Sequence, residues 1–96
     1  MLVLITYDVD TTTKSGEKRL RKVAKECVNY GQRVQNSVFE CLLTGAQLVM
    51  LRATLLSIID DTTDSIRFYH LGNKWQGKIE TIGKITSFDP TETLII

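Results

Sequence analysis

Residues 2–7, with the sequence LVLITY, place the strongest constraint on how this chain folds. The stretch is nearly all apolar and has the composition of a β-strand, which is typical of a central strand that is covered on at least one face. The rest of the chain must supply that cover. At 96 residues the chain forms one domain, which we place at residues 1–96.

Two later segments have the apolar periodicity of helices that pack on a sheet. The first is predicted over residues 17–29, with Gly31 after it as the C′ residue that stops the helix. The second is predicted to begin at Thr44, because T-x-x-Q at 44–47 fits a capping box. The apolar faces are formed by Leu20, Val23, Ala24 and Cys27 in the first helix and by Leu48, Leu51, Leu55, Ile58 and Ile59 in the second.

The remaining segments are predicted to be extended. Residues 32–43 form either two short strands divided near Gln35 and Asn36 or one long bent strand, and residues 65–71 and 78–82 alternate as strands do. With two strands in 32–43 the order is βαββαβ, a ferredoxin-like α+β fold with one antiparallel sheet and two helices on one face. The other face then has no cover within the chain, which predicts a binding surface or a dimer interface.

The chain ends in Leu94, Ile95 and Ile96. Chain ends are often polar and frayed, so three apolar residues here require a place to be buried. We predict an extra C-terminal strand at residues 91–96 that pairs with a sheet edge of the dimer partner. An edge of its own subunit is the alternative.

Positive charge is concentrated in residues 14–33, although the formal net charge of the chain is only +1. The basic residues there are Lys14, Lys18, Arg19, Arg21, Lys22, Lys25 and Arg33. Such a face suits an anionic partner met on one side. The alternative is a solvated helix face, which charge alone favours.

Cys27 and Cys41 lie among apolar residues, with no CxxC motif and no histidine nearby to complete a zinc site. We interpret them as small core residues of a protein in a reducing compartment. The first five residues are too few for a membrane span or a secretory signal. The predicted localisation is cytoplasmic, without a membrane partner.

The first strand ends in two carboxylates, Asp8 and Asp10. If the strand continues, both point to the same face, and such oxygen ligands suit Mg²⁺. The alternative is that one of them caps the threonine-rich turn, which the spacing alone favours. His70, the only histidine, is predicted to be a surface or edge residue. No general base is then evident, and metal-assisted hydrolysis is nearly the only enzymatic chemistry left.

Tyr7-Asp8-Val9 at the end of the first strand, together with R-V-Q-N-S-V-F-E at positions 33–40, resembles the CRISPR-associated protein two family. These are the small endoribonuclease-like subunits of the spacer-acquisition machinery. The resemblance covers essentially the whole chain, including K-R-L-R-K-V-A-K at 18–25 and Y-H-L-G-N at 69–73. Residues 18–40 and the tail are most similar to the type I-C form.

The resemblance implies a symmetric homodimer formed through the sheet faces. It implies that Asp8 is the catalytic residue and that the two Asp8 side chains, one from each subunit, share one Mg²⁺ ion at the two-fold axis. Tyr7, Asp10 and Phe39 are implied as accessory residues, and core packing is an equal alternative for Phe39.

The same resemblance implies the residues that bind nucleic acid. Arg33 and Ser37 would lie beside the Asp8 site and contact phosphate. Arg19 and Arg21 would contact the nucleic-acid backbone from the first helix.

Two functions follow from the resemblance. The first is a Mg²⁺-dependent endonuclease that hydrolyses phosphodiester bonds of RNA, of double-stranded DNA, or of both. The alternative is a non-catalytic scaffold, in which the dimer binds double-stranded DNA and bridges dimers of the CRISPR integrase subunit. A regulatory domain that binds a metabolite is a third hypothesis, but the expected glycine-rich ligand loop is missing.

Overall fold

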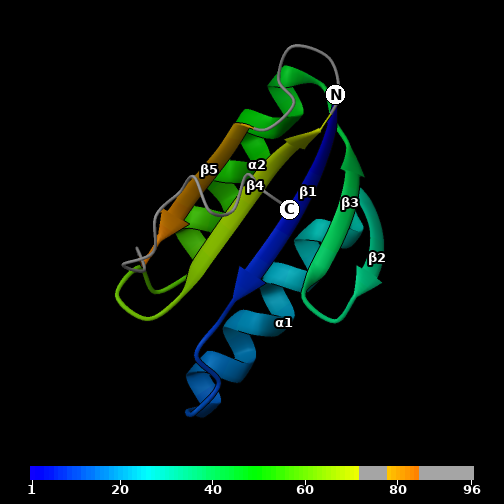
Figure 1. The fold of residues 1–96 in the computed structure, drawn as a ribbon. Coiled ribbons are helices and arrows are strands. Elements are labelled where there is room, and N and C mark those ends of the chain that lie inside the picture. Colours follow the sequence, from blue (N-terminus) through cyan, green and yellow to red (C-terminus); the bar gives the residue numbers. More distant parts are fainter. Residues whose placement is uncertain (72–77, 85–96) are drawn as a thin grey trace.

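Both helices lie on one face of a five-stranded sheet in the computed structural model of the chain (Figure 1). The structure describes residues 1–71 and 78–84. The elements are β1 (Leu2–Asp8), α1 (Lys14–Val28), β2 (Gly31–Gln35), β3 (Val38–Leu42), α2 (Gly45–Ile58), β4 (Ser65–Leu71) and β5 (Lys78–Gly83). The predicted α+β class is confirmed, and the strand predicted at 91–96 lies outside the described residues.

The strand order in the sheet is β2-β3-β1-β4-β5, and every neighbouring pair is antiparallel. The first four strands have the ferredoxin-like arrangement that the sequence predicted, and β5 extends the sheet beyond β4. β1 is the central strand. The 32–43 segment forms two strands, and the register between them shifts at the residues from Arg33 to Gln35.

Both helices begin at a threonine cap. Thr44 and Gln47 form the reciprocal capping box that the sequence predicted for α2. Thr13 caps α1, because its Oγ1 accepts a hydrogen bond from the Gly16 N–H at 3.0 Å. α1 therefore begins at Lys14 instead of the predicted residue 17. Gly16 fits in this first turn because a side chain there would collide with the backbone carbonyl of Asp10.

The prediction that Gly31 is the C′ residue that stops α1 is wrong. Asn29 is the C-cap, and Gly31 already begins β2. Among the described glycines only Gly83 has a positive φ, at 88°. Gly31 is needed for a different reason, since a side chain there would collide with Cys41 and the backbone of Glu40 on β3.

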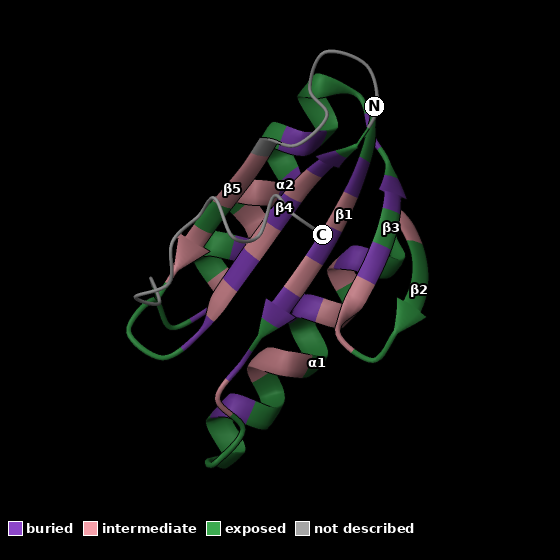
Figure 2. Ribbon diagram, in the orientation of Figure 1, coloured by how far each residue is buried: buried purple, intermediate pink, exposed green. Residues whose placement is uncertain are grey.

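The core lies between the sheet and the two helices. Buried and more exposed residues alternate along the central strands (Figure 2), as expected when one face of a sheet is covered. The fully buried apolar side chains are Val3, Ile5, Val23, Cys27, Phe39, Cys41, Leu55, Ile66 and Phe68. The two cysteines are core residues as predicted, and burial raises the pKa of Cys27 to about 12 and that of Cys41 to about 11. Both therefore stay neutral thiols near pH 7.

His70 is not a surface residue, contrary to the prediction. The period of β4 places His70 on the same side as Ile66 and Phe68, and only 4% of its surface is exposed. Its Nε2 lies 2.7 Å from Glu80 Oε1, and Arg52 Nη2 of α2 lies 2.6 Å from Glu80 Oε2. A polar cluster on the covered face of the sheet therefore joins β4, β5 and α2 through His70, Glu80 and Arg52.

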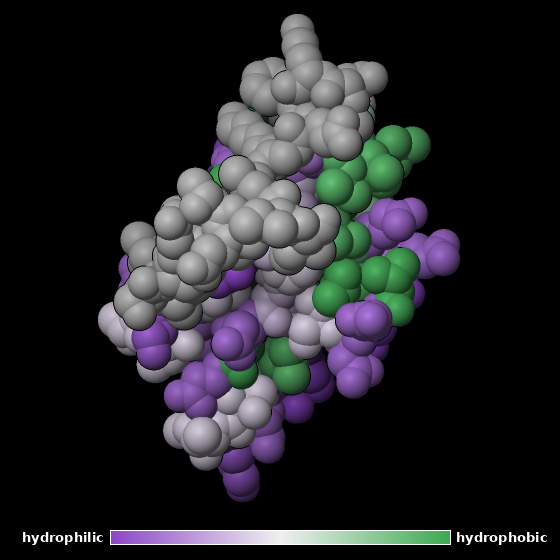
Figure 3. Space-filling view, in the orientation of Figure 1, coloured by the Kyte–Doolittle hydropathy of each residue, from purple (hydrophilic) through white to green (hydrophobic). Residues whose placement is uncertain are grey.

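The face of the sheet that points away from the helices is partly apolar. No described element covers it (Figure 1). Leu42 is 75% exposed, and Leu2 and Leu71 are 36% and 39% exposed. Figure 3 views the molecule from this side and shows apolar side chains gathered over β1 and β3. We call this side of the sheet the open face.

Neither α1 nor α2, the helices of the described residues, is long and apolar enough to span a membrane.

Candidate functional site

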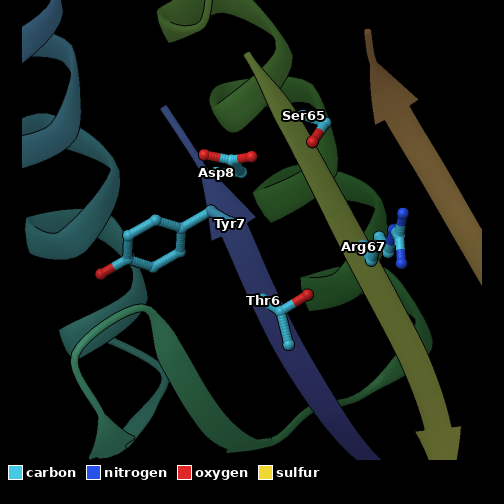
Figure 4. Close-up of a pocket in the computed structure, with 5 residues that line it drawn as sticks. All are labelled: Thr6, Tyr7, Asp8, Ser65 and Arg67. Atoms are coloured by element: carbon cyan, nitrogen blue, oxygen red, sulfur yellow. The ribbon is translucent and has the colours of Figure 1, made fainter. Parts of the chain in front are cut away.

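Asp8 is the last residue of β1 and is exposed on the open face. The preceding Tyr7 points into the core, so the alternation of the strand directs Asp8 and Thr6 to the open face. β4 runs antiparallel beside β1 and places Ser65 opposite Asp8 and Arg67 opposite Thr6. These four residues and Tyr7 line a pocket of about 240 Å³ at the end of β1 (Figure 4).

The pocket contains the types of group that bind a hard cation and an oxyanion. Asp8 contributes a carboxylate, and Thr6 and Ser65 contribute hydroxyl oxygens. An all-oxygen set of this kind fits Mg²⁺, which is usually held by one or two carboxylates together with waters. Within the described ranges 1–71 and 78–84, no three His, Cys, Asp or Glu side chains are grouped to hold a metal. A cation at Asp8 therefore needs waters, substrate oxygens or a second chain to complete its shell.

Asp10 does not join Asp8. The strand ends at Asp8, and Asp10 Oδ1 accepts hydrogen bonds from the Thr12 backbone N–H at 3.0 Å and the Thr12 hydroxyl at 2.8 Å. These hydrogen bonds lower the pKa of Asp10 below its usual value. Asp10 therefore caps the threonine-rich turn, which was the alternative to a metal-binding role. Of the two carboxylates, only Asp8 lines the pocket.

Arg19 has a structural partner. Its Nε lies 2.8 Å and its Nη2 3.4 Å from the two carboxylate oxygens of Asp64, which is fully buried, and its Nη1 donates to Ser15 Oγ at 3.0 Å. Arg21 is exposed on α1, together with Lys18, Lys22 and Lys25. Contact of either arginine with nucleic acid stays a prediction, and Arg21 has the more accessible side chain.

Arg33 and Phe39 face the helix side of the sheet. They are opposite each other in the β2–β3 register, and the Arg33 guanidinium carbon lies 5.2 Å from the centre of the Phe39 ring. Phe39 is fully buried and stacks on Tyr7, with ring centres 6.1 Å apart. Phe39 is thus a core residue, the alternative that the sequence left open. Within one chain, Arg33 and Asp8 lie on opposite faces of the sheet.

Tyr7 and Ser37 connect the end of β1 to the β2–β3 turn. The Tyr7 N–H donates to the Ser37 carbonyl at 3.1 Å, and the Tyr7 hydroxyl donates to the Asn36 carbonyl at 3.3 Å. Burial raises the pKa of Tyr7, an effect that the nearby Arg33 only partly offsets. Tyr7 is thus a neutral anchor that fixes the end of β1, and Ser37 lies next to that end. Contact of Ser37 with phosphate stays a prediction.

The sequence analysis missed Ser65 and Arg67 as site residues. It predicted their strand, but alternation within a strand does not say which residue of another strand lies opposite. The available signal was the ferredoxin-like order, which makes the first and fourth strands antiparallel neighbours. In that order the beginning of residues 65–71 must lie beside the end of residues 2–8.

Similar proteins are known. The profile of the family described as "CRISPR associated protein Cas2" matches residues 1–79. The chain is 58% identical to the CRISPR-associated endonuclease Cas2 of Halalkalibacterium halodurans over 95 residues, which are 99% of each chain. It is 55% identical to the CRISPR-associated endoribonuclease Cas2 of Chlorobaculum tepidum over 96 residues and the full length of both. The crystal structure of Streptococcus pyogenes Cas2 at pH 6.5 matches with a TM-score of 0.72 and 63% identity, covering 86% of this chain and 100% of that one.

Proposed function

Because the chain belongs to the CRISPR-associated protein Cas2 family, we propose that it is a Mg²⁺-dependent endonuclease of CRISPR adaptation in the cytoplasm. Its substrates are RNA, double-stranded DNA, or both. The relatives compared above are named as an endonuclease and an endoribonuclease. The observation that carries the proposal is the exposed Asp8 at the end of a core strand, in a pocket that also holds two hydroxyls and a guanidinium. The type I-C subtype stays a prediction.

The active form proposed here is a homodimer that pairs the open faces. Leu2, Leu42 and Leu71 leave apolar surface on this face, and burial of such surface favours association. A two-fold axis near the end of β1 brings a second Asp8 to the first, which supplies the carboxylate that one chain lacks. One symmetric contact thus buries the apolar face and completes the site.

In this dimer the two Asp8 carboxylates are the protein ligands of one Mg²⁺ ion, and hydroxyl groups of Thr6 and Ser65 lie beside them. When bound, Mg²⁺ supplies positive charge that stabilises the reacting phosphate and makes a bound water more acidic. Tyr7 holds the end of β1 through its contacts with Ser37 and Asn36.

A cleavage assay tests this function. Purified protein is incubated with labelled single-stranded RNA or duplex DNA, in Mg²⁺ or in EDTA. We expect cleavage of at least one substrate in Mg²⁺, no cleavage in EDTA, and recovery when Mg²⁺ is added back in excess. Cleavage that continues in EDTA, or no cleavage of either substrate, would contradict the proposal.

Dimerisation through the open face predicts that Leu42→Glu separates the subunits. Leu42 is 75% exposed and lies opposite Leu2 in the β1–β3 register, so a carboxylate there would be buried without a partner in the interface. We expect the dissociation constant to rise by about 100-fold or more, measured by sedimentation velocity across protein concentrations.

Val49→Glu is the matched control, because Val49 is 60% exposed but lies on α2, away from the open face. It should leave the dimer intact. A Leu42→Glu protein with the mass of the wild type would show that this face is not the interface.

The second candidate function is a DNA-binding scaffold for the CRISPR integrase subunit. It is favoured by the exposed basic residues of α1, which lie outside the Asp8 site. Contacts of lysine and arginine with phosphates bind duplex DNA without reading its sequence. In this function the dimer bridges integrase dimers, and Asp8 is not needed.

Substitution of basic residues on α1 tests the scaffold. The variant Arg21→Gln/Lys22→Gln leaves Arg19 unchanged, because loss of Arg19 would also leave the buried Asp64 carboxylate without its ion-pair partner. Each lost phosphate contact should reduce the slope of log K against log salt by roughly 0.9, measured by anisotropy with labelled duplex DNA. Lys84→Gln, an exposed charge at the end of β5, is the control and should change the slope less. An unchanged slope in the double variant would exclude this face.

A further inference from the structure

Asp8 and Ser65 form the last pair in the register of β1 and β4. Both line the pocket, and Figure 4 shows their side chains at neighbouring strand ends. Strand ends fray unless other contacts hold them. A catalytic group that is misplaced by about 1 Å can lose about 100-fold in rate. The contacts just beyond this pair therefore decide how well Asp8 is placed for the proposed reaction.

Asp64, the residue before Ser65, holds both strand ends. Its side chain is fully buried, and its Oδ1 accepts the Asp10 N–H at 3.0 Å, two residues beyond Asp8. Its backbone carbonyl accepts the Lys84 N–H at 2.6 Å, just after β5. One residue thus connects the end of β1, the start of β4 and the end of β5.

The two loops that meet at Asp64 are each closed by an aspartate and a threonine. Asp10 Oδ1 accepts the N–H and the hydroxyl of Thr12, and Asp60 Oδ1 accepts the same two groups of Thr62. Asp64 Oδ2 also accepts the Asp60 N–H at 2.9 Å, so both turns are anchored on one carboxylate. Because each loop is internally hydrogen-bonded, a shift of this carboxylate moves the end of β1 with it.

Arg19 of α1 fixes the orientation of that carboxylate. Its Nε lies 2.8 Å from Asp64 Oδ2, and its Nη2 lies 3.4 Å from Oδ1. A guanidinium that donates to both oxygens restricts their rotation, which a lysine ammonium does not do. The Arg19 Nη1 donates to Ser15 Oγ at 3.0 Å, and the side chain is only 18% exposed. All three of its nitrogens therefore have an acceptor inside the chain.

We propose that Arg19 is a positioning residue of the Asp8 site, and that it acts through Asp64 to hold the end of β1 against the start of β4. This differs from the contact with nucleic acid that the resemblance implied for Arg19. Arg21, which is exposed on the same helix, is the better placed of the two for that contact. The inference rests on the proposed function, because it takes Asp8 as the group to be placed.

Amide hydrogen exchange, followed by NMR, tests the inference without catalysis. Arg19→Lys keeps the charge next to Asp64 but loses the fork and the contact with Ser15. We expect the Asp10 N–H to exchange about tenfold faster in this variant than in the wild type. The amide of Ile5, in the middle of β1, should change less. A general loss of stability would instead act most strongly on the core amide.

Two controls accompany this measurement. Arg21→Lys makes the same change at an exposed position of α1 and should leave the Asp10 rate unchanged. If Arg19→Lys does not fold, Ser15→Ala takes its place, because it removes only the Nη1 contact and should raise the Asp10 rate by about twofold. The inference is overturned if the Asp10 rate stays at the wild-type value, or if it rises no more than that of Ile5.

Binding of duplex DNA separates positioning from phosphate contact. The variant Arg19→Gln/Asp64→Asn removes the charge of Arg19 without leaving a buried carboxylate unpaired. If Arg19 contacts a phosphate, the slope of log K against log salt should fall by roughly 0.9. We expect an unchanged slope, and a fall of that size would overturn the inference.

Metal binding and kinetics connect the inference to the reaction. Arg19→Lys should raise the dissociation constant of Mg²⁺, measured by calorimetry, and lower the single-turnover rate at saturating protein, each by about tenfold. The protein concentration that gives half the maximal rate should not change. A wild-type protein that neither binds Mg²⁺ nor cleaves nucleic acid contradicts the nuclease proposal, and the exchange rates still decide the role of Arg19. A wild type that does both, with Arg19→Lys equal to it, overturns the inference alone.

Discussion

Asp8→Asn is expected to abolish Mg²⁺-dependent cleavage, with a loss of about 100-fold or more in the single-turnover rate. Asparagine keeps the shape of the side chain but removes its charge. Because the proposed ion lies on a two-fold axis, one substitution in the gene removes both carboxylates of the site. Asp8 is exposed at the end of β1, so the fold should be retained, which a thermal melt would verify.

The measurement combines the cleavage rate with Mg²⁺ binding by calorimetry, and both should be lost together. Asp61→Asn is the matched control, because Asp61 is an exposed aspartate in the segment between α2 and β4 and lines no part of the pocket. An Asp8→Asn protein that binds Mg²⁺ and cleaves at the wild-type rate would place the chemistry elsewhere in the chain.

Asp64→Ala should lower the free energy of unfolding by about 3 kcal/mol, which is the scale for removing one partner of a buried ion pair. Asp64 is fully buried and joins three parts of the chain. Its carboxylate accepts the Arg19 Nε–H of α1 at 2.8 Å, the Asp10 N–H at 3.0 Å and the Asp60 N–H at 2.9 Å. Alanine leaves all three donors without their acceptor and leaves a cavity.

Urea unfolding of Asp64→Ala and wild type measures this loss. Asp61→Ala is again the control, since an exposed substitution in the same segment should change stability by no more than about 0.5 kcal/mol. Equal midpoints for Asp64→Ala and the wild type would show that the buried carboxylate contributes nothing. Asp64→Ala should also loosen the position of Asp8. Asp64 accepts a hydrogen bond from the Asp10 N–H, and Asp10 lies only two residues beyond the end of β1.

The same carboxylate predicts a dependence of stability on pH. Burial by itself opposes ionisation of Asp64, but the hydrogen bonds from Arg19 and from the backbone N–H groups of Asp60 and Asp10 outweigh it and hold its pKa below the usual value. A carboxyl group whose pKa is lower in the folded state contributes stability above the unfolded-state value of about 4. That contribution is lost as the pH falls through the lower folded value.

Thermal melts at a series of pH values below neutrality check this. The wild type should lose melting temperature once the pH falls below about 4, and Asp64→Ala should lose less over the same range. Asp10 and Asp60 also have a lowered pKa, caused by hydrogen bonds from Thr12 and Thr62, so part of the acid dependence should persist in the variant. Parallel curves for the two proteins would contradict the assignment to Asp64.

Much of the fold could be predicted because its signals are local. The apolar run at 2–7, the periodicity of both helices and the capping box at Thr44 each lie within a few residues of sequence, and the structure has all of them. The prediction that His70 is a surface residue was wrong because a strand of period two places His70 on the same face as the core residues Ile66 and Phe68. The start of α1 was missed because Thr13 caps it from a stretch that has the composition of a loop.

For the candidate site, too, the local features could be predicted from the sequence, whereas the contacts between distant residues could not. The sequence by itself determined that a core strand ends in Asp8, because strand composition and the position of a charge are local properties. Only the tertiary structure decided that Ser65 and Arg67 lie beside Asp8, that Asp10 turns away to Thr12, and that Arg19 holds Asp64 across 45 positions. The physical reason is that strand register and buried ion pairs are set by how separate elements pack together, and that packing joins residues far apart in the chain.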